Sequence, residues 1–258
     1  MRVLGFLAVA CAYAFILAPV VFVVLISFSA DAFVRFPPSG WSLKWYSGLF
    51  VHASFRAALA TSLEIASVVT CLAMLIGVPA AFSVVRMRKA REALYGILTA
   101  PQLMPSVVLG LALLLVFAPS HLVATKSGVV IAHVVVTLPF VVRVLVTAFG
   151  TVTTDYENAA ATLGASPIVV FRRITLPLIA PGLLSAAAIA FIVSFDETVV
   201  TIFLSGPRFT TLPVEIYNYV SYKTDPLIAA LSTFLLVATA LLVTLVERSM
   251  GLMRAVGR

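Results

Sequence analysis

Residues 150–177, GTVTTDYENAAATLGASPIVVFRRITLP, form a polar stretch between two long apolar runs. Its first part predicts a short helix in which Thr154 caps the amide of Glu157 and Glu157 reaches back, as in a capping box. Gly164 suits the left-handed position that ends a helix, and Ser166-Pro167 is typical of the start of the next helix. The stretch therefore predicts two helices joined at a glycine. Its run of alanines would leave a narrow surface that another protein could approach closely, and the alternative is an ordinary linker with good caps.

The apolar runs on both sides of this stretch extend over most of the chain. Hydrophobic residues make up 62% of the 258 residues and charged residues only 10%, whereas soluble domains have about 45–50% and about 25%. A soluble protein of this size has too little interior to bury so much apolar surface. The composition therefore excludes a soluble domain and a disordered chain, and it indicates an all-α integral membrane protein.

Six apolar stretches reach the length of roughly 20 residues that a transmembrane helix needs. They cover about 3–29, 58–85, 93–118, 128–149, 178–204 and 227–246, within a single transmembrane domain over 1–258. The first is too long for the core of a cleaved signal peptide, so we expect it to stay as a span. Pro101 and Pro105 should kink the third.

Basic residues are distributed unequally between the two sides that six spans would define. Ten of the seventeen Lys and Arg residues fall at the termini and in the loops after the second and fourth spans, and six fall on the other side. The remaining one, Arg143, lies near the inner end of the fourth span. From there it can snorkel to the headgroups, and the alternative is a gating role. Because Lys and Arg favour the cytoplasmic side, we expect both termini and residues 150–177 in the cytoplasm.

Ionisable residues inside spans are costly, and they mark candidate functional positions. Glu64 lies in the second span on one helical face with Ser67 and Cys71. That face could line a path, or Glu64 could lie at the outer interface or form a structural pair. The two cysteines, Cys11 and Cys71, both fall in apolar runs and imply no disulfide framework.

Asp196 and Glu197 lie about 27 Å along the fifth span by helical rise, in its outer part. Helical periodicity favours Glu197 as the acid that faces a substrate path, because it lies on a polar stripe. The members of that stripe are Ser194, Glu197, Thr198, Thr201 and Ser205. Asp196 would then pair with a neighbouring helix or subunit. Two acids on the entry side suit a cationic cargo, and the alternative is a structural pair or an interface cap.

Catalytic and metal-binding sites are not expected. His121 and His133 lie on different elements without Cys, Asp or Glu at ligand spacing. The sequence contains neither His-Glu-x-x-His nor a glycine-rich phosphate loop.

Residues 157–177 resemble the EAA loop of ABC importer permeases, whose pattern is Glu-Ala-Ala, three residues, Gly, nine residues and Ile-x-Leu-Pro. The spacing from Gly164 to the final Ile-x-Leu-Pro matches in full. Aligned on Gly164, the Glu of the pattern falls on Asn158, and Glu157 precedes it by one residue, so either could take its place. The resemblance implies that this loop couples the chain to an ATPase. The residues that it assigns to coupling are Glu157, Asn158, Ala159, Ala160, Gly164, Ile174, Leu176 and Pro177.

Other stretches are similar to spermidine/putrescine-type permeases, namely 36–46, 194–197, 203–207 and 211–217. The resemblance implies a six-span type I importer permease fold in a bacterial inner membrane, with residues 150–177 as a cytoplasmic helix-turn-helix coupling loop. It implies as partners two ATP-binding subunits, a second permease and an extracytoplasmic solute-binding protein. ATP and Mg would be bound by the ATPase subunits, and no cofactor by this chain.

The resemblance favours a polyamine such as spermidine or putrescine as cargo, although relatives carry other small solutes, including amino acids and organophosphonates. It also favours a heterodimeric permease pair over two copies of one chain. The substrate path would include Glu197, Asp196, Glu64, Ser194 and Thr198. Alternatives are an ion-coupled secondary transporter, whose internal repeats and paired broken helices we do not find in the sequence, and an intramembrane enzyme.

The predicted orientation can be tested by reporter fusions. Fusions at Arg88 and Arg254 should report a cytoplasmic location, and a fusion at Gly40 should report the opposite side, because of the distribution of basic residues. The measurement is the paired activity of a reporter active only in the cytoplasm and one active only outside. A reversed signal at any of the three positions would contradict the six-span topology.

Overall fold

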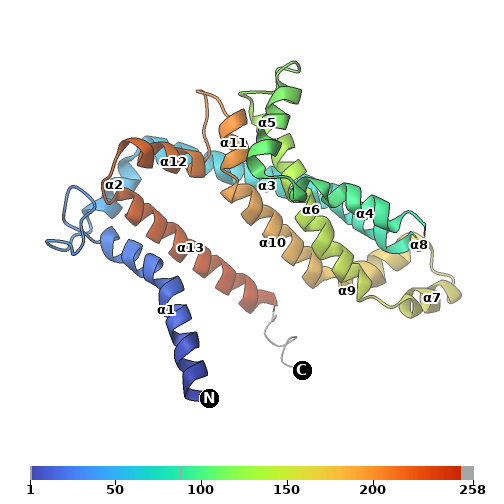
Figure 1. Cartoon of the computed structure of the whole chain (residues 1–258). Coiled ribbons are helices and arrows are strands. Elements are labelled where there is room, and N and C mark those ends of the chain that lie inside the picture. Colours follow the sequence, from blue (N-terminus) through green and yellow to red (C-terminus); the bar gives the residue numbers. More distant parts are fainter. Residues whose placement is uncertain (1, 88, 251–258) are drawn as a thin grey trace. The chain divides into compact units, whose positions relative to one another are not determined.

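The computed structural model of this chain describes residues 2–87 and 89–250, and every regular element among them is helical (Figure 1). Arg88, Arg254 and Arg258, on which the predicted orientation partly rests, lie outside the described residues. The chain divides into two compact units. Unit 1 holds the described residues up to Ala57 together with those from Ile216 onward, and unit 2 holds Ala58–Glu215.

Unit 1 is built from helices at both ends of the chain. α1 spans Arg2–Ser27, α2 spans Lys44–Val51 and α13 spans Leu227–Met250. α13 packs against both α1 and α2, and Gly48 of α2 lies against the side chain of Leu227. Most apolar side chains of α1 remain exposed, as expected of a helix that faces lipid.

The segment 28–43 between α1 and α2 is held by specific hydrogen bonds. Trp45 Nε1 donates to the backbone oxygen of Ser29 at 2.9 Å. The carboxylate of Asp31 accepts bonds from the hydroxyl and the backbone N–H of Ser39. These two bonds stabilise the charged form and hold the pKa of Asp31 below its usual value. Hydrogen bonds therefore order this segment, which also exposes large apolar side chains such as Phe33 and Trp41, where the sequence predicts an outer loop.

Unit 2 contains the other helices, of which α3 and α12 cross its boundaries. They are α3 Ala53–Arg86, α4 Arg91–Thr99, η1 Ala100–Leu103, α5 Ser106–Phe117, α6 Lys126–Gly150, α7 Thr154–Thr162, α8 Pro167–Val170, η2 Phe171–Thr175, α9 Leu176–Leu178, α10 Ala180–Asp196, α11 Val199–Leu204 and α12 Leu212–Tyr222. Of these, α7, α8, η2 and α9 fall in the 150–177 stretch and at the start of the next apolar run.

Within the described residues, three helices are long and apolar enough to cross a membrane unbroken: Gly5–Ser27, α3 and α6. Two more crossings result if each bent pair is one span, namely Arg91–Leu103 with α5 and Pro167–Leu178 with α10. The apolar part of α13, Leu227–Leu241, is shorter. These stretches overlap the six predicted spans, and the six-span topology itself stays a prediction.

Proline bends the third apolar stretch, as predicted. The axis turns by 101° between the run ending in η1 and α5. Pro101 lies in the first turn of η1 and Pro105 is the N-cap of α5. Because proline lacks a backbone N–H, neither position loses a helical hydrogen bond there. The prediction of one continuous helix over 178–204 is wrong, because α10 ends at Asp196 and α11 starts again at Val199.

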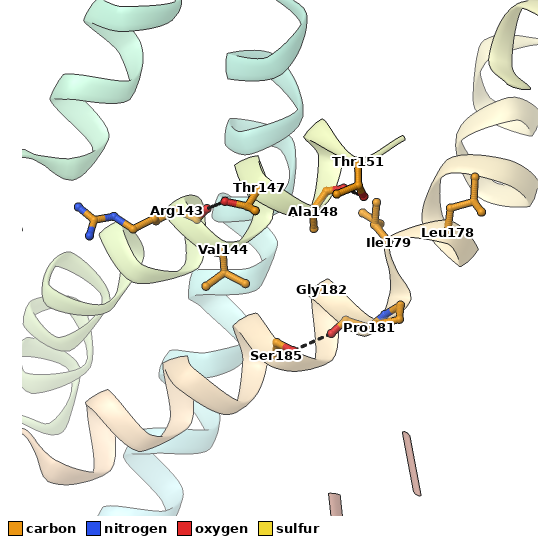
Figure 2. Close-up of a pocket in the computed structure, with 10 residues that line it drawn as sticks. All are labelled: Arg143, Val144, Thr147, Ala148, Thr151, Leu178, Ile179, Pro181, Gly182 and Ser185. Atoms are coloured by element: carbon orange, nitrogen blue, oxygen red, sulfur yellow. Dashed lines mark hydrogen bonds between the residues drawn. The ribbon is translucent and has the colours of Figure 1, made fainter. Parts of the chain in front are cut away.

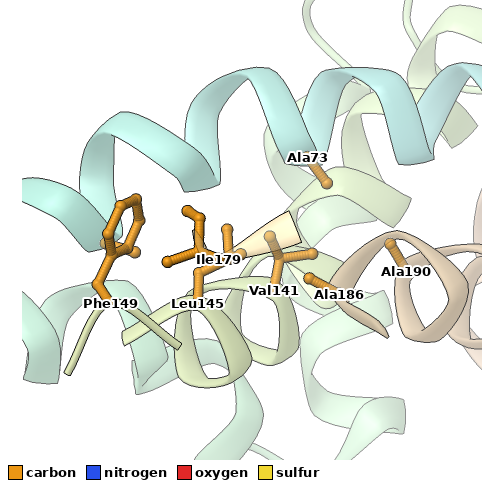
Figure 3. Packing of buried hydrophobic residues seen from close by; sticks show 8 residues of the cluster. Ala73, Val141, Leu145, Phe149, Ile179, Ala186 and Ala190 are labelled. Carbon is orange, nitrogen blue, oxygen red and sulfur yellow. The ribbon is translucent and has the colours of Figure 1, made fainter. Parts of the chain in front are cut away.

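The core of unit 2 is the contact between α6 and α10. Small residues recur at every fourth position of α10, so its backbone can approach α6 closely. At one end, a Cβ on Gly182 would run into the side chain of Ala148. Further along, Val141 and Leu145 of α6 are fully buried in the same cluster as α10 (Figure 3). The small residues at this four-residue spacing are Gly182, Ala186, Ala190 and Ser194. α3 approaches α6 in the same way, with Gly77 lying against Val141.

Candidate functional site

The turn at the centre of residues 150–177 has the predicted conformation. Gly164 has φ of +84°, and α7 ends in a Schellman motif. In this motif Gly164 N donates to Ala161 O at 2.9 Å and Ala165 N donates to Ala160 O at 3.1 Å. Ser166 is the N-cap of α8 and Pro167 its first residue. Two short helices therefore meet at Gly164, where most other residues would be strained because of the positive φ.

The predicted capping box at the start of α7 is wrong. The N-cap is Thr153 rather than Thr154, and its side chain makes no capping bond. The carboxylate of Glu157 turns into the protein, where Arg86 and Thr175 bind it. A long-range ion pair has therefore displaced the local pattern that the sequence suggested.

Glu157 is the buried charged residue of this segment, with 9% of its surface exposed. Oε2 pairs with the guanidinium of Arg86 at the end of α3, and Oε1 accepts from the hydroxyl of Thr175 at 2.6 Å. Arg86 also lies over the ring of Phe82 at 4.8 Å. Asn158, the alternative position for the acid of the pattern, is exposed on α7.

The outward surface of α7 consists of small or polar side chains and one large one, that of Tyr156. Ala159 is exposed and Ala160 half-buried, and Leu163 at the end of the helix is 88% exposed. At the other end of the segment, Ile174 and Leu176 are half-buried and Pro177 is exposed. The segment thus combines an anchored acid with an accessible, largely apolar face, on which another protein could dock closely.

The helix containing Ile174, Leu176 and Pro177 includes one wide turn. η2 is a π-helix over Phe171–Thr175, and Leu176 N donates to Phe171 O, five residues earlier. Pro177 has no N–H, and its ring in a regular helix would clash with the carbonyl four residues earlier. The wide turn accommodates this proline and leaves Thr175 fully buried against Glu157.

The second candidate site lies where α10 breaks. Glu197 and Thr198 separate α10 from α11, with Glu197 in an extended conformation. The side chain of Glu197 accepts from the backbone N–H of Val200 at 3.0 Å, which caps the start of α11. The predicted continuous polar stripe through Ser194, Glu197 and Thr198 is therefore wrong, because the helical periodicity is interrupted between them.

His133 of α6 bridges this break and is 1% exposed. Its Nδ1 lies 3.0 Å from the hydroxyl of Ser194 on α10, and its Nε2 lies 2.8 Å from the hydroxyl of Thr201 on α11. Thr201 uses its only proton to donate to the backbone oxygen of Glu197 at 2.5 Å. We therefore assign the ring proton to Nε2, with Ser194 donating to Nδ1.

Sequence reasoning did not single out His133. The rule that marks charged residues within spans as functional applies equally to a histidine in an apolar span, and applying it would have pointed to this position. Both partners of His133, Ser194 and Thr201, lie on the predicted polar stripe, but the sequence analysis assigned that stripe to a substrate path and not to His133.

The structure places the two other predicted acids apart from the break network. Asp196 is exposed at the end of α10, and no ion pair to it is present among the described residues. Glu64 on α3 pairs with Lys126 at the start of α6, with 2.5 Å between Oε2 and Nζ. Both partners of this pair are about half exposed, which is the structural alternative that the sequence had left open for Glu64.

No metal site is formed by the part of the chain that the structure describes, since no three His, Cys, Asp or Glu residues come together there. Cys11 and Cys71 are both free and exposed.

A groove of about 500 Å³ lies between the end of α6 and the start of α10. Figure 2 shows its lining, in which Ser185 Oγ donates to the backbone oxygen of Pro181 at 2.9 Å. The guanidinium of Arg143 points away from the other lining residues, consistent with an exposed side chain that can snorkel. The groove gives Arg143 no partner that would indicate a gating role.

Comparisons with known proteins point in one direction. The family model described as "Binding-protein-dependent transport system inner membrane component" matches residues 73–255. The putrescine transport system permease protein PotI of Escherichia coli K12 is 34% identical over 237 residues, covering 89% of this chain and 84% of that protein. The spermidine/putrescine transport system permease protein PotC of Haemophilus influenzae is 30% identical, covering 90% and 91%.

A relative with a different named cargo is also similar. The molybdenum transport system permease protein ModB of Mycobacterium bovis is 37% identical over 221 residues, covering 80% of this chain and 82% of that protein.

Solved structures share the fold. A chain of a bacterial ABC transporter involved in import of the acidic polysaccharide alginate superposes with a TM-score of 0.73 at 14% identity, covering 96% of both chains. A chain of the MetNI methionine ABC transporter superposes with a TM-score of 0.65 at 20% identity, covering 81% of this chain and 98% of that one.

The turn at Gly164 yields one test. Gly164→Val places a β-branched residue at positive φ, at a cost of about 1–2 kcal/mol. Hydrogen exchange of the amides of Gly164 and Ala165 should then be about tenfold faster, since their bonds to Ala161 and Ala160 are lost. Gly164→Asn is the matched control, because Asn accepts the left-handed region. Equal protection in all three proteins would contradict the motif.

The His133 network yields another. His133→Ala leaves the hydroxyl of Ser194 buried without its partner, and we expect the thermal unfolding midpoint of the purified protein to fall by about 4 °C. His133→Gln, which keeps a donor and an acceptor, should fall less. His121→Asn, at an exposed histidine with positive φ, is the control. An unchanged midpoint in His133→Ala would show that the network does not brace the break.

Proposed function

Because the chain belongs to the family of binding-protein-dependent transport system inner membrane components, we propose that it carries a polyamine such as putrescine or spermidine across the membrane. The chain is a membrane-spanning permease subunit of an ABC importer with the type I permease fold, located in the inner membrane. The observation that carries the cargo proposal is the 34% identity to a putrescine permease over 89% of the chain.

The charges around the break in α10 support a cationic cargo. Asp196 is exposed at the last position of α10, where the partial negative charge of the helix dipole adds to its own. Glu197 uses Oε1 to cap α11 and is half-buried. Its remaining oxygen could accept hydrogen bonds from a cargo ammonium, so the substrate path would include Glu197, Asp196 and Thr198. Irregular backbone at membrane depth is tolerated where it lines a cavity, as a substrate path requires.

The coupling role belongs to residues 150–177, which match the EAA pattern of ABC importer permeases. Two ATP-binding subunits would bind ATP and Mg and hydrolyse ATP, so that this chain is not itself an enzyme and holds no cofactor. One of them would dock on the exposed face of α7, around Asn158, Ala159 and Leu163. A second, homologous permease and an extracytoplasmic binding protein complete the transporter, with both termini of this chain in the cytoplasm.

A second cargo class has one observation in its favour, the 37% identity to a molybdenum permease. The deciding experiment reconstitutes the complete transporter with its binding protein in proteoliposomes and compares putrescine, spermidine and molybdate. We expect ATP hydrolysis to rise with the polyamines alone. Stimulation by molybdate, or uptake that follows an ion gradient without ATP, would contradict the proposal.

The acid at the break provides a sharper test of cargo charge. Glu197→Gln keeps an oxygen that can cap Val200 but removes the negative charge, and uptake should fall about tenfold because a cation loses its compensating charge. The loss should be larger for spermidine than for putrescine, which carries less charge. Glu92→Gln, an exposed acid in the first turn of α4, is the control. Unchanged uptake would show that Glu197 only caps α11.

A further inference from the structure

Both carboxylate oxygens of Glu157 are bound by side chains of this chain. Arg86 comes from the end of α3 and Thr175 from η2, so that one residue of α7 binds one element 71 positions before it and another 18 positions after it. With 9% of its surface exposed, Glu157 offers little to another protein. Its neighbour Asn158, in contrast, is exposed on the outer face of the same helix.

Arg86 is itself fixed by an aromatic cluster. Its guanidinium lies over Phe82, whose ring packs edge-on against Phe149 at 5.4 Å and Phe171 at 5.3 Å between centroids. Phe149 belongs to the end of α6 and Phe171 to the start of η2. The orientation of Arg86 is therefore set by contacts among α3, the end of α6 and the start of η2.

From these contacts we propose that Glu157 is a positioning residue. It locks α7 to α3 and η2 through Arg86 and Thr175, and it thereby fixes the direction in which the exposed face of α7 meets the ATPase. This inference rests on the proposed docking of an ATPase on α7. It assigns Glu157 a role inside the chain, and it leaves Asn158 at the position that faces the partner.

The burial of the pair gives this role a distinct energetic signature. Arg86 has a side chain that is 43% exposed, so it can be hydrated when its partner is lost. Glu157 is buried, so its charge remains uncompensated when Arg86 is lost, which is the costlier change. Removing Arg86 should consequently destabilise the packing of α7 more than removing the charge of Glu157 does. Removing both should restore most of that packing.

The experiment compares Arg86→Met, Glu157→Gln and the double variant in the complete transporter, with cargo-stimulated ATP hydrolysis and co-purification of the ATPase as readouts. We expect Arg86→Met to lose at least about tenfold in stimulated hydrolysis, from the unpaired buried charge. Glu157→Gln should stay within about threefold of the wild type, since the amide oxygen can still accept from Arg86 while the amide NH2 donates to the hydroxyl of Thr175. The double variant should recover to the level of Glu157→Gln.

Two further variants keep the test decisive. Arg91→Met, which removes an exposed cation from the start of α4, should behave as the wild type. Thr175→Val removes one donor to Glu157 at nearly constant volume. Its loss of stimulated ATP hydrolysis should lie between those of Glu157→Gln and Arg86→Met. If Arg86→Met does not insert into the membrane, Thr175→Val takes its place in the test and should still hydrolyse less ATP than Glu157→Gln. If Glu157→Gln is as damaging as Arg86→Met and the double variant does not recover, Glu157 acts directly on the ATPase and the inference is overturned.

Hydrogen exchange on the isolated chain separates this inference from the proposed function. Arg86→Met should speed exchange of the amides of α7, and the double variant should restore their protection. If the wild-type chain failed to bind an ATPase, the proposed function would be contradicted, and the exchange result would still decide the role of Glu157. Unchanged protection of α7 in Arg86→Met would overturn the positioning role.

Discussion

The close approach of α6 and α10 is the constraint on which both candidate sites depend. It is possible because α10 presents a small residue at every fourth position, from Gly182 to Ser194. In a lipid environment, where apolar surface alone does not drive helices together, such close packing and the hydrogen bonds that it permits hold the pair. α6 ends where residues 150–177 begin, and α10 begins just after they end. The same contact therefore fixes both ends of that segment.

The α6–α10 pair also carries the polar network at the helix break. Ser194 is the last small residue of the packed face, and its hydroxyl reaches His133 of α6 because no larger side chain separates the two helices. The chain breaks three residues later, at Glu197. One packed interface thus joins the segment that matches the EAA pattern to the acidic residues proposed to meet the cargo. A displacement of α7 would reach α6 through Arg86, Phe82 and Phe149.

Local sequence patterns predicted those features whose cause is local. The left-handed turn at Gly164, the start of α8 at Ser166 and the bend near Pro105 each follow from the backbone limits of one or two residues. The break at Glu197 could not be read from sequence, because no glycine or proline is present there. It is held by His133, 61 positions from Ser194, and by the cap on Val200. The pairing of Glu157 with Arg86 could not be predicted from the sequence either. The residues around Glu157 fit a capping box, which favoured a local hydrogen bond over a long-range ion pair. The polar stripe failed because it assumed a regular helix across the break.

The π-helical turn over Phe171–Thr175 makes residues 164–177 a segment of fixed length. A wide turn holds one residue more than a regular turn, and each residue of a helix rotates its successor by about 100°. With the wide turn kept, deleting a single residue between Gly164 and Phe171 would shift Thr175 by one helical position and rotate it away from Glu157. Evolution can therefore exchange side chains along this stretch more readily than it can shorten or lengthen it. The spacing of nine residues between the glycine and Ile-x-Leu-Pro has, in this chain, a mechanical meaning independent of which residues fill it.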